Sequence, residues 1–328
     1  MKKDMHDRFT WSPGDVTIES DVEKHTPGGH EHDQDKHGDR GGTSSASVPT
    51  VDRAASEAAH DFIQRGDKRI VAQSGMIYGD KELDALRGQA KAKIVADVGA
   101  RLEADESFRV TDAQRDMFGS AVMANDVVDR ALRQWSSAAA DSEPKSLAMQ
   151  LAAAEEFDVP QESRLGMTHL AGTVGTAAAR ALYEEPTGGG PWSRSVLRPL
   201  LRSMYEHTQD ELKAAGVERV TLYRGFSISG STLFDKLPEF VKDGGVGPYT
   251  QNPISSWSAD KGIATGFASG YWVVTDGKRY GTGRILTATF PRERILSTAR
   301  TGLGSLPEYE YTILAGPGEV KVEHAGRD

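Results

Sequence analysis

Glu308-Tyr309-Glu310-Tyr311-Thr312-Ile313-Leu314 lies near the C-terminus of this 328-residue chain and predicts a β-strand that carries two carboxylates. Successive side chains of a strand point to opposite faces, so Glu308 and Glu310 are expected side by side on one face. Like charges this close are normally avoided. The pair is therefore either two surface acids on a solvated edge strand or a catalytic pair, and the upstream sequence must distinguish the two.

Val220-Thr221-Leu222-Tyr223-Arg224-Gly225-Phe226 is a second predicted strand, rich in β-forming residues, with one arginine in its middle. A guanidinium is always charged and presents a rigid fork of donors that suits phosphate. An inward Arg224 beside the permissive Gly225 therefore indicates anion recognition. An arginine in solvent on an edge strand is the alternative.

A serine cluster follows in Pro253-Ile254-Ser255-Ser256-Trp257-Ser258-Ala259-Asp260, a predicted strand that leads into a short helix over 261–268. Asp260 or Ser258 is expected to cap that helix, because either side chain can accept a hydrogen bond from an amide of the first turn. Capping uses one hydroxyl of the cluster at most. The remaining serines are available to orient a neighbouring carboxylate.

The motifs at 223–225, 256–258 and 308–310 occur in an order that carries more information than any one of them. Together they resemble the arginine–serine–glutamate class of mono-ADP-ribosyltransferases, whose pattern is Tyr-Arg-Gly or similar, then Ser-Thr-Ser, then Glu-x-Glu. The resemblance covers about residues 217–324 and includes a loop before the glutamates, here 299–307. The chain departs from the family at Trp257, where threonine is usual. The resemblance implies an α+β fold with a mixed α/β core of two packed sheets and a cleft for NAD.

The resemblance also implies roles for the residues of the three motifs. Cleavage of nicotinamide from NAD leaves an oxocarbenium-like ribose, so the site needs a carboxylate beside the ribose and a group that holds the phosphates. Glu310 is expected to stabilise the cation, Ser256 to orient Glu310, and Arg224 to anchor the NAD phosphates or ribose. The implied cofactor-binding set also contains Tyr223, Gly225, Ser258 and Phe267, the last by stacking on nicotinamide unless it is a core residue of its helix.

Glu308 carries the prediction about the acceptor. In the family, a glutamate two positions before the catalytic one accompanies transfer to arginine, because a guanidinium must be oriented and must give up a proton as the new bond forms. We therefore expect an NAD-dependent transferase that modifies a protein arginine, with NAD as substrate and no metal. Three alternatives stay open: an NAD glycohydrolase with water as acceptor, a nucleic-acid acceptor, and a virion or assembly protein that carries the transferase fold as a passenger.

Composition divides the chain into three parts. Residues 1–50 hold ten acids, six bases and five of the nine histidines, and predict a disordered acidic tail. The cluster His30, His32, Asp33 and His37 fits a solvated tail better than a metal site. Residues 51–190 form a predicted all-α region, and residues 191–328 form the transferase-like domain. The stretch 135–157 resembles helical regions upstream of such domains in proteins encoded by bacteriophages of actinobacteria.

Helices are predicted from apolar residues at three-to-four spacing in alanine-rich stretches, at 51–64, 81–102, 111–137 and 147–157. A further helix over 192–215 is expected to have Ser195 as its cap and Pro199 near its start. Its apolar face would consist of Val196, Leu197, Leu200, Leu201, Met204, Tyr205 and Leu212. Short strands are expected at 271–274, 283–290, 294–296 and 319–323.

The overall composition excludes several classes of protein. A net charge of -9 and the lack of a basic patch argue against tight nonspecific binding to nucleic acid. With no cysteine, the chain has no disulfide, thiol nucleophile or cysteine-ligated zinc. No apolar signal segment or membrane-spanning run is evident, so no membrane partner is expected. The expected location is the cytoplasm, that of a host cell if a bacteriophage encodes the chain, with packaging in a virion as an alternative.

Overall fold

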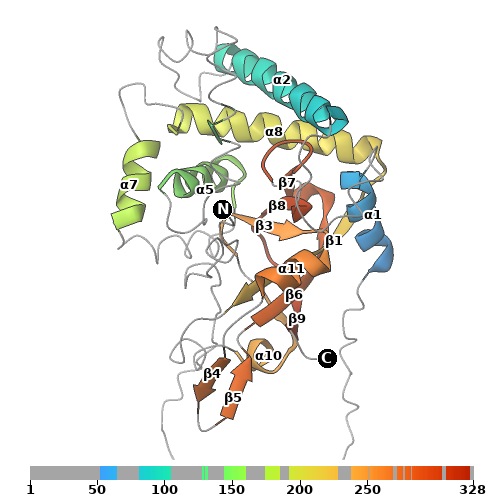
Figure 1. Cartoon of the computed structure of the whole chain (residues 1–328). Coiled ribbons are helices and arrows are strands. Elements are labelled where there is room, and N and C mark those ends of the chain that lie inside the picture. Colours follow the sequence, from blue (N-terminus) through green and yellow to red (C-terminus); the bar gives the residue numbers. More distant parts are fainter. Residues whose placement is uncertain are drawn as a thin grey trace, which may run out of the picture.

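A computed structural model describes most of the second half of the chain and parts of the first half (Figure 1). The described residues are 52–64, 81–104, 128, 130–131, 144–159, 174–184, 192–227, 238–249, 251–268, 272–275, 278–281, 283–304 and 308–325. The predicted tail over 1–50, with its histidine cluster, lies outside them. So does most of the helix predicted over 111–137.

The described residues form an α+β structure. Its helices are α1 (Arg53–Gln64), α2 (Lys81–Ala104), α5 (Pro144–Glu156), α7 (Val174–Tyr183), α8 (Arg194–Ala214), α10 (Glu239–Lys242) and α11 (Lys261–Phe267). Its strands are β1 (Arg219–Ser227), β2 (Gly245–Pro248), β3 (Ile254–Ser258), β4 (Trp272–Thr275), β5 (Lys278–Gly281), β6 (Gly283–Pro291), β7 (Ile295–Thr298), β8 (Glu310–Leu314) and β9 (Glu319–His324). No helix among the described residues is long and apolar enough to cross a membrane.

Seven strands form one sheet in the order β2-β9-β6-β1-β3-β8-β7, and each pairing is antiparallel. β1 and β6 pair over their full length, and so do β3 and β8. By contrast, β1 and β3 are in register at one pair, Tyr223 opposite Ser258. We call this pair the junction, because it joins one half of the sheet, β2-β9-β6-β1, to the other half, β3-β8-β7.

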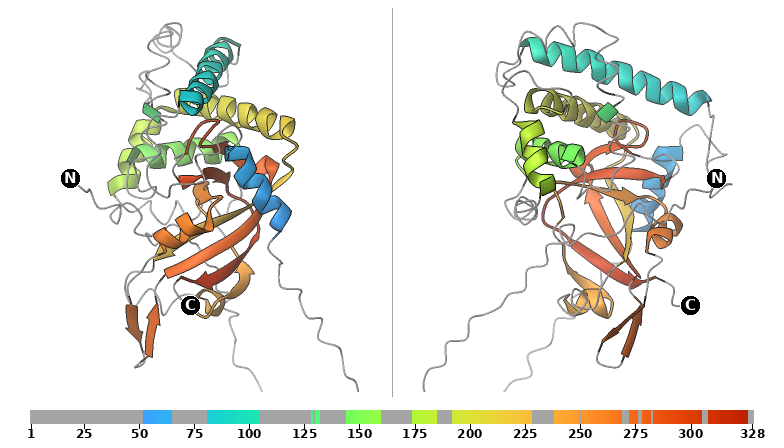
Figure 2. Two further views of the ribbon diagram at one scale, coloured as in Figure 1. Left: turned by 45° about the vertical axis from the view of Figure 1, so that its right-hand side comes forward. Right: turned by 60° about the vertical axis from the view of Figure 1, so that its left-hand side comes forward.

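The junction qualifies the expectation of two packed sheets. Hydrogen bonds link all seven strands into a single sheet, so two separate sheets are not formed by these strands. The two halves nevertheless occupy different places in the molecule. Figures 1 and 2 show β3, β7 and β8 close to α5 and α8, whereas β6 and β9 extend away from these helices. The hairpin of β4 and β5 forms a separate two-stranded sheet at the far end.

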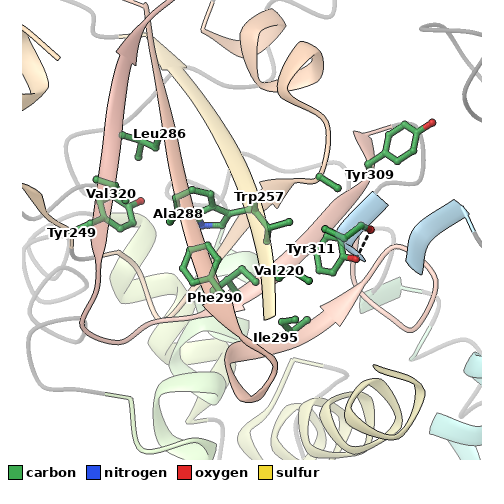
Figure 3. Packing of buried hydrophobic residues seen from close by; sticks show 14 of the residues in the cluster. Val220, Tyr249, Trp257, Leu286, Ala288, Phe290, Ile295, Tyr309, Tyr311 and Val320 are labelled. Atoms are coloured by element: carbon green, nitrogen blue, oxygen red, sulfur yellow. Dashed lines mark hydrogen bonds between the residues drawn. The ribbon is translucent and has the colours of Figure 1, made fainter. Parts of the chain in front are cut away.

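One face of the sheet is covered by the main hydrophobic core (Figure 3). Trp257 is 2% exposed and lies at its centre, with its ring packed edge-on against Tyr249 and Phe290. The indole Nε1 donates to Gln251 Oε1 at 3.1 Å, so its polar atom is satisfied inside the core. Strand alternation points Trp257 away from the face that bears Ser256 and Ser258. Tryptophan at this position therefore fills the core and leaves the opposite face to the two serines.

Helices α2, α5 and α8 form a second hydrophobic cluster with the half of the sheet that contains β3, β7 and β8. The predicted apolar face of α8 is confirmed for the residues that the helix buries most deeply, Val196, Leu197, Leu200, Leu201, Met204 and Leu212. The predicted cap is wrong. Ser193 is the N-cap and Arg194 begins the helix, so Pro199 lies inside α8 and not in its first turn.

A cluster of ion pairs links α5 to α8. The Glu156 carboxylate, which is nearly buried, accepts hydrogen bonds from Arg198 Nε and Arg202 Nε, each at 2.8 Å. The Arg202 guanidinium also lies over the Phe157 ring, 4.8 Å from its centroid. Because the two arginines are four residues apart on α8, they face the same side of the helix and converge on one acid.

Helix α1 packs on the sheet although it lies in the predicted helical region. Ala59, Phe62 and Ile63 belong to the same core cluster as Val220 and Tyr311. Complete burial raises the pKa of Tyr311, so its hydroxyl remains protonated and donates to the Ala59 carbonyl oxygen at 2.8 Å. The main core therefore joins a segment near residue 60 to strands more than 150 residues away in sequence.

Two glycines allow α11 to lie directly on β1 and β6. A Cβ added at Gly225 would lie 1.7 Å from the Ala264 carbonyl oxygen, and one added at Gly283 would lie 1.8 Å from the Ala268 carbonyl oxygen. Both contacts are with backbone, which cannot rotate away as a side chain can. Gly225 is thus required for helix packing, which is a different reason from the cofactor contact expected from its place in the motif.

Substitution of Gly225 by alanine should destabilise the protein by roughly 3 kcal/mol, because α11 must shift to admit the methyl group. The matched control is Gly266→Ala in α11, where no atom lies within 4 Å of an added Cβ. That change should be neutral or stabilise by up to about 1 kcal/mol, because alanine favours a helix. Chemical denaturation of both variants measures the difference. Equal stabilities would show that α11 does not rest on β1 as described.

Candidate active site

Ser256 and Glu310 lie on adjacent strands and contact each other. In the register of β3 and β8, Ser256 is opposite Thr312 and Ser258 is opposite Glu310, so the four side chains share one face of the sheet. Ser256 Oγ donates a hydrogen bond to Glu310 Oε1 along the diagonal of this group. The Glu310 residue is only 5% exposed. The structure therefore brings together the serine and the glutamate that the sequence analysis predicts as partners.

Glu308 does not share a strand face with Glu310. β8 begins at Glu310, and Glu308 lies in the turn before it. Between them, Tyr309 has φ of 50°, which is left-handed backbone that bulky residues rarely adopt. This conformation ends the alternation of the strand, so the expectation of two adjacent carboxylates on one strand face is wrong. Glu310 is buried whereas Glu308 is half-buried, so the two acids occupy different environments.

Three hydrogen bonds to consecutive carbonyl oxygens fix this turn. Ser258 Oγ donates to Glu308 O at 2.7 Å, Ala259 N donates to Tyr309 O at 3.0 Å, and Ala299 N donates to Glu310 O at 2.9 Å. The first donor is the last residue of β3, the second follows it directly, and the third directly follows β7. The backbone of the Glu-Tyr-Glu motif is therefore held from both neighbouring strands.

The Ser258 hydroxyl forms its hydrogen bonds with the backbone of the site. It donates to Glu308 O and accepts from Asp260 N at 3.0 Å, so its single proton is already in use. The predicted cap of α11 is confirmed as Asp260, whose Oδ1 accepts from Ile263 N at 3.0 Å. In this arrangement Ser258 positions the turn between Glu308 and Glu310, and the cofactor contact predicted for it would require it to exchange partners.

Arg224 and Tyr223 lie on opposite faces of β1. The pairing of β1 with β6 is regular throughout, so Arg224 falls on the face of Leu222 and Phe226. Tyr223 falls on the face of its partner Ser258, which is also the face of Glu310. Arg224 is half-buried and follows the junction by one residue, where β1 and β3 are no longer in register. The structure thus places Arg224 near the serine motif in the sheet but on the other face.

Phe267 is half-buried near the end of α11 and belongs to none of the hydrophobic clusters formed by the described residues. The buried side of α11 is formed by Ala264 and Ala268, which pack on Tyr223 and Ile285. α11 therefore covers the face of the sheet that also carries Glu310, and it leaves Phe267 partly accessible. A core role, which the sequence left open for Phe267, does not fit this position.

The segment that follows β7, residues 299–304, is anchored to α8 through residues that the sequence motifs do not indicate. Thr208 Oγ1 donates to Thr301 Oγ1 at 2.7 Å, and Thr301 Oγ1 accepts from Thr298 N at 3.0 Å. All three threonines are buried. They fix the described part of the predicted loop, residues 299–304. Thr208 lies about 90 residues before its partners, so local sequence carries no signal of this contact.

No protein-family model matches this chain, and comparisons with curated proteins and with solved structures also find no match. Among the described residues, no group of three or more His, Cys, Asp or Glu is arranged to hold a metal ion.

Replacement of Tyr309 by glycine and by alanine tests the left-handed turn. Both changes remove the ring, but only glycine adopts positive φ without a steric cost. Tyr309→Gly should therefore be more stable than Tyr309→Ala by about 1 kcal/mol, the reverse of the usual order of these residues in regular structure. Paired denaturation curves give the difference directly. If the alanine variant is the more stable of the two, residue 309 does not adopt this conformation in solution.

Proposed function

We propose that this chain is an NAD-dependent mono-ADP-ribosyltransferase that modifies arginine side chains of a protein and releases nicotinamide. The contact between Ser256 and Glu310 carries this proposal. It pairs two residues that the resemblance assigns to one catalytic unit and that are 54 positions apart in the chain. The proposal also draws on the burial of Glu310 and on the order of the three motifs.

Glu310 supplies the charge that the reaction requires. When the bond between the ribose and nicotinamide breaks, positive charge develops on the ribose, and a carboxylate fixed beside it stabilises that charge without reorganising. The hydrogen bond from Ser256 fixes the plane of the carboxylate before NAD binds. Burial strengthens the interaction with the cation, because little water is present to screen it.

Glu308 is assigned to the acceptor. The acceptor guanidinium attacks the ribose carbon and loses a proton as the new C–N bond forms, so a carboxylate must orient it and take that proton. Glu308 is half-buried, whereas Glu310 is buried, and a more accessible acid suits a group that enters from another protein. Water in place of the acceptor would give the NAD glycohydrolase reaction at the same site.

Arg224 is assigned to the NAD phosphates, with Tyr223 and Phe267 as further candidate contacts. A guanidinium binds phosphate through two parallel hydrogen bonds, which an ammonium cannot reproduce. Because Arg224 lies on the face opposite Glu310, it would reach the cofactor at the end of β1 that has separated from β3. This requirement can be tested directly by mutation of Arg224.

Substitution of Glu310 by glutamine should reduce nicotinamide release by at least about a hundredfold, because a neutral amide no longer stabilises the ribose cation. Ser256→Ala should reduce it by about ten- to a hundredfold, as expected for loss of an orienting partner. Glu308→Gln should abolish labelling of the acceptor while nicotinamide release continues. The measurement combines nicotinamide release with transfer of labelled ADP-ribose to proteins of a cell lysate, and Glu319→Gln, an exposed acid on β9, is the control.

Each other outcome identifies a different function. Nicotinamide release without label, insensitive to Glu308→Gln, would establish the glycohydrolase. Label on nucleic acid would contradict the protein acceptor. A wild-type protein that neither binds nor cleaves NAD would exclude the enzyme and favour an assembly role.

Replacement of Arg224 by lysine should raise the KM for NAD by about tenfold with little effect on kcat, because the bidentate contact with phosphate is lost. Steady-state kinetics and the melting temperature are measured on the same preparation. A fall in melting temperature without a change in KM would assign Arg224 to packing alone.

A further inference from the structure

Helix α1 spans the junction between the two halves of the sheet. Its N-terminal end contacts β1, where Thr221 Oγ1 donates to the Asp52 carbonyl oxygen at 3.2 Å. One turn later, Ser56 Oγ lies 3.3 Å from the hydroxyl oxygen of Tyr223, which is itself a residue of the junction. These contacts tie the start of α1 to the half of the sheet that carries Arg224.

The C-terminal end of α1 contacts the other half. The buried Tyr311 hydroxyl on β8 donates to the Ala59 carbonyl oxygen at 2.8 Å. Arg300, in the loop before β8, donates from Nη1 to the Phe62 carbonyl oxygen at 2.6 Å and lies over the Phe62 ring, 5.5 Å from its centroid. A cation at the last carbonyls of a helix satisfies groups that the helix itself leaves without partners.

His60 is the residue of α1 whose ring contacts the turn between Glu308 and Glu310. Its ring centroid lies 5.5 Å from that of Tyr309, with the planes tilted by 48°, which is a favourable aromatic geometry. Figure 3 shows the Tyr309 ring apart from Trp257 and Phe290, at the margin of the core. Tyr309 is also the left-handed residue between the two glutamates. The contact from α1 therefore falls on the residue of the motif whose backbone is most strained.

We propose that α1 is a strap that positions the candidate active site, and that His60 is the positioning residue through which it holds the turn between Glu308 and Glu310. This inference rests on the proposed function for its effect on catalysis. Glu310 is fixed independently by Ser256 at its side chain and by Ala299 at its carbonyl oxygen. Glu308 precedes Tyr309 and depends on the turn. Loss of the His60 ring should therefore reduce transfer of ADP-ribose to the acceptor more than it reduces cleavage of NAD.

The first test measures the turn directly by amide hydrogen exchange. Ala259 N donates to Tyr309 O, so its exchange should become several-fold to about tenfold faster in His60→Ala, as expected for loss of an aromatic pair. The Ala299 amide, which donates to Glu310 O, serves as the internal reference and should change little. His60→Phe should restore slow exchange, because it retains the ring. Glu57→Ala, which removes an exposed ion pair with Arg53 on α1, is the matched control.

The second test compares transfer with cleavage in the same variants. His60→Ala should lower the ratio of acceptor labelling to nicotinamide release by about tenfold, and His60→Phe should restore it. Unchanged exchange at Ala259 in His60→Ala would overturn the strap, whether or not the protein cleaves NAD. Faster exchange at Ala259 with an unchanged ratio of acceptor labelling to nicotinamide release would contradict the effect of the strap on catalysis. If the wild-type protein has no activity on NAD but exchange at Ala259 responds, the proposed function fails and the strap is supported.

Discussion

Ser258 lies where most of the constraints on the site meet. It ends β3, forms the junction with Tyr223, and is the strand partner of Glu310. Its hydroxyl donates to Glu308 O and accepts from Asp260 N, which brings the chain into the first turn of α11. One small polar side chain thus couples the register of two strands, the start of a helix and the path of the turn between Glu308 and Glu310. An alanine at this position would satisfy neither the donor nor the acceptor.

A buried carboxylate lowers the stability of a protein, because ionised groups lose hydration free energy when they leave water. Glu310 lies on a strand whose other residues are buried, and it receives a hydrogen bond from Ser256. Such an arrangement costs stability that an apolar residue would not cost. Proteins tolerate this cost at positions where the charge has a function, and a site that must stabilise a cation is one of them.

The elements of the sheet were predictable where a single local rule determined them. Alternation in β1 and, from Glu310 onward, in β8, the serine strand β3 and the Asp260 cap follow from short-range rules, and the structure confirms them. β2 was not predictable, because Gly245–Pro248 has little strand propensity and pairs with β9 through tertiary context. The position of α1 was not predictable either, because its partners Tyr309 and Tyr311 lie about 250 residues further along the chain.

The predictions for the site failed where backbone conformation departed from the strand. Nothing in Glu308-Tyr309-Glu310 signals positive φ at its centre, since tyrosine favours strands and asparagine or glycine would be usual at such a position. Glycine would remove the strain but would also remove the ring that contacts His60. Tyrosine at this position therefore keeps the contact with His60 although its backbone is strained, and this contact makes the turn more rigid. A rigid turn keeps one acid buried against Ser256 and the other closer to the surface, which is the division that the two roles proposed for these acids would use.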